Sequence, residues 1–278
     1  MGVLRGFASP TNLWGNPQHT YVTSDQGDSW GCWGGSSGGT SICSGSGSVP
    51  RARCLAGPFG IAGIIYGVTG VCHQTANRIL FPAGVTVYKA GGYWASLLVY
   101  GVYGTNTVAW LASLGTCYAI IPAFKKPASA RKKQPAKQPR VRAADTKTKA
   151  FMANVLALHE SGLANLGRPD LKALAGKETG LLLDHLAPKP LTTAVKNNII
   201  RLRQQNDDRL RALADMVHAG KIDGPKFAAD GNAAITGLFS KLARTLGAQA
   251  YTDMFGQPPQ VEVKLIDPEM AAKSFSNG

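Results

Sequence analysis

A strongly basic run divides the chain and constrains its folding more than any other feature. Residues 125–149 contain ten Lys or Arg and one acidic residue, separated by Pro, Ala and Gln without apolar periodicity. Such a segment cannot bury enough apolar surface to fold by itself. The sequence therefore predicts a domain at residues 1–124, a basic Pro/Ala/Lys linker at 125–149, and a helical domain at 150–278.

The composition of the predicted domains differs. Residues 1–124 hold two thirds of the 33 glycines, all five Trp and all five Cys. The net charge of +14 divides into +3 for residues 1–124, +9 for the linker and +2 for residues 150–278. Because most of the net positive charge lies in the linker, the two flanking parts are not expected to bind nucleic acid. The linker is the candidate binding segment for an acidic partner or nucleic acid.

Targeting and membrane signals are weak. The first residues lack an apolar stretch of the length that a secretory signal peptide needs, so we expect a cytoplasmic protein or one delivered by a non-classical route. Residues 94–124 are long and apolar enough to span a bilayer, but Gly, Thr and Asn interrupt them. This favours short buried strands, so a membrane partner is not the favoured prediction.

The cysteines predict neither a metal site nor a disulfide framework. Their number is odd, and they show no zinc-site spacing. We therefore expect no metal or cofactor, and we expect buried thiols in a reducing compartment at every cysteine except Cys72.

Local patterns predict an α+β N-terminal domain, an antiparallel sheet with a Cys-bearing helix. HTYVTS, a Gly-containing turn and SWGCWGG predict a hairpin, and the Gly/Ser-rich residues 36–53 predict a surface connection. Residues 71–80 predict a helix that ends before Pro82, and the apolar runs within residues 85–124 predict strands.

The C-terminal part is predicted to be mainly α-helical. Apolar residues recur at helical spacing, and Thr192 or Thr193 can cap one helix. The predicted helices cover residues 151–163, 171–186, 195–217 and 235–246, and VEVKLI at 261–266 predicts a short strand. The arginines near residues 201–211 are balanced by acidic neighbours, which predicts an exposed helix face.

Cys72 and His19 are the candidate nucleophile and general base. Cys72 lies in the first turn of its predicted helix, where unpaired amides and the helix dipole lower a thiol pKa and can hold an oxyanion. His19 begins the first predicted strand, and its neutral imidazole could accept the thiol proton. A buried structural cysteine and a surface histidine are the alternatives.

Asp28 is the predicted third catalytic residue. Asp25 and Asp28 are the only carboxylates in residues 1–124. A position at the hairpin tip would place Asp28 beyond hydrogen-bond reach of His19. A turn role for Asp28 therefore stays open, with a nearby Asn, Gln or backbone carbonyl as the group that orients His19.

Four further residues are predicted to bind substrate. His73 and Gln74 follow Cys72 directly, and Trp30 and Trp33 would form an aromatic wall beside the cleft. A buried aromatic cluster under a Gly-rich loop is the alternative role for the two tryptophans.

The order of these elements resembles a known family. A strand beginning HTYV ahead of a Cys-led helix, GVCHQTANRIL, is similar to the circularly permuted papain-like thiol hydrolases, the group related to NlpC/P60 peptidases and lecithin:retinol acyltransferases. The resemblance covers residues 10–124 and implies the roles given to His19 and Cys72. The motif is GVCHQ rather than DCSGF or NCEHF. GVC also looks like the transglutaminase-like nucleophile turn, but there the histidine follows the cysteine, and here none lies between His73 and His159.

The resulting expectation is a thiol-dependent hydrolase or acyltransferase that acts on an amide, peptide or ester bond. The substrate would be a peptide, peptidoglycan or a protein, and the resemblance implies a bacterial effector or cell-wall peptidase. The C-terminal helices would bind a partner or serve delivery. Alternatives are a non-enzymatic nucleic-acid-binding or virion-associated structural protein that uses the basic linker, and a membrane-inserting protein that uses residues 93–124.

Overall fold

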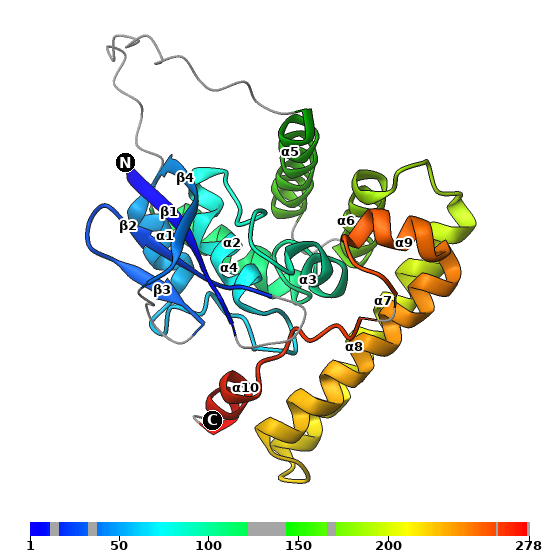
Figure 1. Cartoon of the computed structure of the whole chain (residues 1–278). Helices are drawn as coiled ribbons and strands as arrows, with labels where there is room; N and C mark the ends of the chain where they lie inside the picture. The colour runs from blue at the N-terminus through cyan, green and yellow to red at the C-terminus, as the bar shows by residue number, and fades with distance from the viewer. Residues whose placement is uncertain (12–16, 33–37, 122–142, 166–170, 260, 277–278) are drawn as a thin grey trace.

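The chain forms an α+β fold with its sheet at the N-terminus (Figure 1). The computed structural model describes residues 1–11, 17–32, 38–121, 143–165, 171–259 and 261–276. These residues form a four-stranded antiparallel sheet, ten α-helices and one short 3-10 helix. All of the elements after the fourth strand are helical.

The sheet contains β1 (Gly2–Ser9), β2 (His19–Ser24), β3 (Ser29–Gly31) and β4 (Thr40–Gly47) in the order β3-β2-β1-β4. The predicted hairpin is confirmed as β2 and β3. The prediction of a surface connection at residues 36–53 is wrong where β4 and helix α1 (Val49–Ala56) form. Glycine in β4 allows the chain around Ala83 to pack closely on this strand, because a Cβ at Gly47 would lie 2.9 Å from the Ala83 backbone nitrogen.

The helix predicted at residues 71–80 is confirmed as α2 (Cys72–Leu80), which is followed by the 3-10 helix η1 (Phe81–Ala83). The strands predicted within residues 85–124 are wrong, because this region contains α3 (Tyr93–Tyr100) and α4 (Thr107–Ile120). Almost every residue of α3 is buried, so its sequence carries no amphipathic period that distinguishes helix from strand. Within the described residues, no helix has both the length and the apolar character required to cross a membrane.

The predicted C-terminal helices are confirmed as α5 (Ala143–Ala164), α6 (Leu171–Leu186), α7 (Thr193–His218) and α8 (Gly224–Leu246). Two short helices follow them, α9 (Ala248–Phe255) and α10 (Pro268–Ser276). Thr192 caps α7 by accepting a hydrogen bond from the Val195 amide at 3.3 Å. The end of the predicted linker, residues 143–149, belongs to α5, and residues 122–142 lie outside the described part of the chain.

The N-terminal and C-terminal helices share one continuous set of buried apolar side chains. Helix α4 packs on α5 and α6, and α3 packs on α6 and α7. This contact places the C-terminal helices against the unit that carries the sheet (Figure 1).

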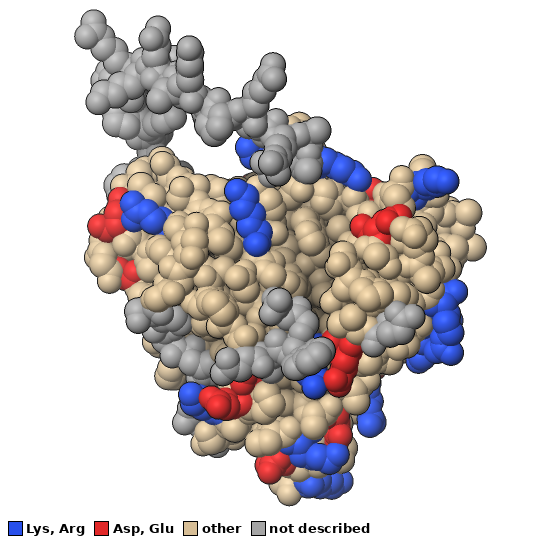
Figure 2. Space-filling view, viewed as in Figure 1, with Lys and Arg blue, Asp and Glu red and all other residues tan. Residues whose placement is uncertain are grey.

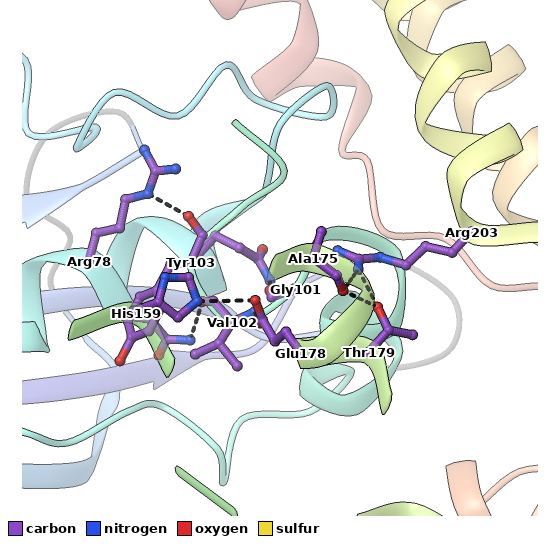
Figure 3. A network of polar contacts seen from close by, with 11 residues as sticks. Arg78, Gly101, Val102, Tyr103, His159, Ala175, Glu178, Thr179 and Arg203 are labelled. Atoms are coloured by element: carbon purple, nitrogen blue, oxygen red, sulfur yellow. Dashed lines mark hydrogen bonds and ion pairs between the residues drawn. The ribbon is translucent and has the colours of Figure 1, made fainter. Parts of the chain in front are cut away.

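A buried polar network also joins the two parts (Figure 3). Glu178 of α6 accepts a hydrogen bond from the Val102 amide and another, of 3.1 Å, from Nε2 of His159 on α5. Arg203 of α7 donates to the Val99 carbonyl at 3.2 Å and is 7% exposed, so the prediction of an exposed face is wrong at this residue. Burial opposes ionisation of Glu178, but His159 and Arg203 lower its pKa overall.

Substitution of Glu178 should therefore destabilise the fold. Glu178→Ala removes one of the two carboxylates, with Asp207, whose charge favours the buried Arg203 guanidinium. It also leaves the Val102 amide and Nε2 of His159 without their acceptor. We therefore expect the free energy of unfolding at neutral pH to fall by about 3 kcal/mol. Urea denaturation measures the change, with Glu160→Ala on the exposed face of α5 as the control. The difference should shrink in acid as pH falls through the lowered pKa of Glu178. Equal stability of the two variants would contradict this role.

A disulfide joins Cys54 of α1 to Cys117 of α4, with their Cα atoms 5.8 Å apart. The prediction of free thiols is therefore wrong for these two residues, while Cys32, Cys43 and Cys72 are free. The pair is separated by 63 residues, and it is the packing of α1 on α4 that brings the two sulfurs together.

Candidate active site

Cys72 and His19 meet where α2 packs on β2. Cys72 is the first residue of α2 and His19 is the first residue of β2. Their side chains are hydrogen-bonded, and both border the same small cavity. The Cys72 sulfur also lies 3.7 Å from the Gln18 carbonyl oxygen. The two residues that sequence reasoning singled out are thus direct neighbours.

The electrostatics of this pair shift the pKa of each group toward its charged form. Burial alone would raise the pKa of Cys72, but the hydrogen bond and charge of His19, with smaller contributions from the backbone and hydroxyl of Thr20, lower it overall. Burial alone would lower the pKa of His19, but the hydrogen bond and charge of Cys72, and the charge of Asp267, raise it overall. Each group therefore stabilises the charged form of the other.

The other two free thiols lack this activation. Burial raises the pKa of Cys43 to about 11. Cys32 is 2% exposed, its sulfur lies 3.1 Å from the Thr75 hydroxyl, and burial raises its pKa well above the ordinary value. Cys72 is the free cysteine whose pKa is lowered, which is the property expected of a nucleophilic thiol.

The start of α2 offers two amides to a developing negative charge. The Val71 amide donates to Oε1 of Gln74 at 3.1 Å, and the Gln74 amide donates to the Val71 carbonyl at 3.1 Å. Among the described residues, the amides of Cys72 and His73 have no acceptor of this kind. An oxygen bound near the sulfur could accept hydrogen bonds from both, as in an oxyanion hole.

Helix α2 is held rigidly by its buried polar side chains. Gln74, Asn77 and Arg78 donate hydrogen bonds of 2.8, 2.9 and 2.6 Å to the three consecutive carbonyls of residues 101–103. All three side chains are at most 1% exposed. This anchoring fixes α2, and with it Cys72, relative to the segment that follows α3.

His73 and Gln74 have different positions relative to the site. His73 borders the cavity and is 1% exposed, with Nδ1 at 2.8 Å from the Ser96 hydroxyl. Burial lowers the pKa of His73 to about 4, so it is neutral at physiological pH. Gln74 is fully buried, and its contacts hold α2 in place rather than facing the cavity.

Asp28 and Trp30 lie away from the candidate nucleophile, while Trp33 is outside the described residues. Asp28 occupies the turn after β2, at the opposite end of that strand from His19, and accepts a 2.7 Å hydrogen bond from Arg53. The structure therefore corrects the prediction that Asp28 orients His19. Trp30 is opposite Val22 in β3 and packs on the core, not on the cavity.

Several residues near Cys72 were missed by the sequence reasoning. The cavity is also bordered by Tyr66, Leu265, Asp267 and Met270. Three of these lie almost 200 residues beyond Cys72, and no motif connects them to it. Only the tertiary structure could assign them to the site.

The described residues contain no group of three His, Cys, Asp or Glu side chains that could hold a metal. Most of the basic linker lies outside the described residues, so its predicted acidic or nucleic-acid partner has no structural description. On the face in Figure 2, the Lys and Arg side chains of the described residues are scattered, and several lie beside acidic ones. This part of the surface shows no continuous basic patch.

Comparison of the chain with protein-family models, with curated proteins and with solved structures returns no match. The functional conclusion is therefore drawn from the geometry and the chemistry of the Cys72 site.

Proposed function

We propose that the chain is a thiol-dependent hydrolase or acyltransferase that acts on an amide, peptide or ester carbonyl. The observation that carries this proposal is the contact between a low-pKa cysteine and a high-pKa histidine at a helix N-terminus. The order of the His-bearing strand and the Cys-bearing helix, which resembles that of permuted papain-like thiol hydrolases, supports the same reaction class.

In the proposed reaction, the Cys72 thiolate attacks the carbonyl carbon, and the carbonyl π electrons move to its oxygen. The amides of Cys72 and His73 stabilise that oxyanion. The His19 imidazolium then gives its proton to the leaving nitrogen or oxygen as the bond to carbon breaks, which leaves a thioester on Cys72. Water or an acceptor amine or hydroxyl attacks the thioester, His19 takes its proton, and the Cys72 thiolate leaves.

The substrate class that we propose is a peptide, a peptidoglycan peptide or a protein, by analogy with the families that this arrangement resembles. We also propose that the two parts of the chain have separate roles. The sheet and α2 carry the chemistry, and the C-terminal helices control access or contact a partner. This division is one of function, since the parts share buried side chains.

The proposal predicts selective alkylation of Cys72. At about pH 6.5, where an ordinary thiol is protonated, iodoacetamide should modify Cys72 faster than Cys43 or Cys32, because its thiolate is the most populated. Peptide mass mapping identifies the modified residue. Cys72→Ala should abolish this reaction, and the matched variant Cys43→Ala should keep it. A Cys72 alkylation rate that rises only over the alkaline range in which the Cys43 rate rises would refute the proposal, because closure of the site slows the reaction without moving its pH dependence.

A further inference from the structure

The cavity beside Cys72 and His19 is too small for any substrate of the proposed reaction. Its volume is about 20 Å³. A single water needs about 10–15 Å³ of such volume, and ligand pockets typically have roughly 300–1,000 Å³. Cys72 itself is only 7% exposed. The site is therefore closed in this structure.

Residues 263–270, which we call the covering segment, form one side of this small cavity. This segment has no regular secondary structure as far as Asp267, includes the first turn of α10, and passes beside the part of the chain that carries the sheet (Figure 1). Leu265, Asp267 and Met270 border the cavity together with His19 and Cys72.

The covering segment is attached mainly to α8. Asn232 accepts hydrogen bonds from the amides of Leu265 and Ile266 at 2.9 and 3.0 Å and donates to the Ile266 carbonyl at 2.8 Å. The Thr236 hydroxyl bonds both backbone groups of Val263 at 3.3 Å. These side chains take the place of a neighbouring strand, so the prediction of a strand at 261–266 is wrong.

The covering segment makes fewer of the hydrogen bonds described here to residues 1–121, the part of the chain that carries the sheet, than to α8. The Asp267 amide donates a hydrogen bond to the Tyr66 hydroxyl at 3.1 Å. Ile266 adds an apolar contact near Gly67, where a Cβ would lie 3.0 Å from its side chain. The Asp267 carboxylate adds charge attraction to the His19 imidazolium. Departure of the segment from the site would break this hydrogen bond and expose the buried Leu265 and Ile266 side chains.

We propose that the covering segment is an intramolecular inhibitor that occupies the substrate-binding space over Cys72 and must move away before a substrate can bind. This inference rests on the proposed function, because it assigns regulation to the same thiol. The C-terminal helices thereby acquire a defined role, since α8 carries the residues that hold the segment over the site.

The test uses a variant that weakens the attachment of the covering segment to α8 and leaves the residues that border the cavity unchanged. In Asn232→Ala, the amides of Leu265 and Ile266 lose their acceptor, so the open state should become more populated. We expect iodoacetamide to alkylate Cys72 at least tenfold faster than in the wild type. Asn198→Ala is the matched control. The Asn198 side chain, near the start of α7, donates a hydrogen bond to Thr245, near the end of α8, and neither residue bonds the covering segment. This variant should leave the rate unchanged.

A second measurement needs no variant. The carboxamidomethyl group left on Cys72 is larger than the closed cavity, so alkylated wild type should exchange the amide hydrogens of residues 263–270 faster than the untreated protein. Unchanged alkylation in folded Asn232→Ala, or unchanged exchange after alkylation, would overturn the inference and leave the proposed function standing. Ordinary high-pH reactivity of Cys72 in both wild type and Asn232→Ala would overturn both.

Discussion

His19→Ala should remove the activation of Cys72. The imidazole supplies the hydrogen bond and the positive charge that lower the pKa of Cys72, while the burial that raises it stays in place. The thiolate should therefore form only at alkaline pH, above the ordinary thiol pKa. At about pH 6.5 we expect the rate of Cys72 alkylation to fall by about 100-fold, the scale of a lost acid–base partner.

One measurement, made on two variants, separates this effect from a structural one. Ultraviolet thiolate absorbance, taken as the difference between each protein and its Cys72→Ala counterpart, reports the titration of Cys72 without any reagent entering the site. Its step should move to higher pH in His19→Ala and stay in place in His73→Gln, because His73 is already neutral. A step that stays at low pH without His19 would show that the helix N-terminus alone activates the thiol.

Loss of the Cys54–Cys117 disulfide should produce the largest change in stability. The bond closes a loop with a sequence separation of 63, and its removal frees the unfolded chain. For a loop of this size we expect the free energy of unfolding to fall by about 4 kcal/mol in the Cys54→Ala, Cys117→Ala double variant. Urea denaturation of the oxidised proteins measures the difference, with Cys43→Ala as the control that removes a free thiol.

A thiol count checks the same bond independently. Alkylation of the denatured protein should modify three cysteines before reduction and all five after it. Five modified cysteines without reductant would contradict the bond and imply that the double variant has nearly wild-type stability.

Local signals in the sequence predicted α2 and the hairpin of β2 and β3 well. The run of residues 71–80 between a Gly-containing turn and Pro82 contains its own start and stop signals, and it became α2. The turn after HTYVTS likewise determined the hairpin. These signals act within a few residues, so they can be read without tertiary contacts.

The same reasoning failed for α3 and α4, where nearly uniform burial or apolarity removes the periodic pattern. It also failed for β4, whose Gly and Ser residues resemble a loop until β1 pairs with them. In each case the neighbouring elements provide the stabilising contacts, and the local sequence does not encode which neighbours are present.

The sequence by itself determined the three-part charge pattern, the helix that begins at Cys72, the strand that begins at His19 and the long C-terminal helices. The tertiary structure alone decided which groups surround the thiol. It paired Cys54 with Cys117 and placed Leu265, Asp267 and Met270 over Cys72. The physical reason is sequence distance: contacts between residues about 60 to 200 positions apart depend on how whole elements pack, and no local propensity or spacing records that packing.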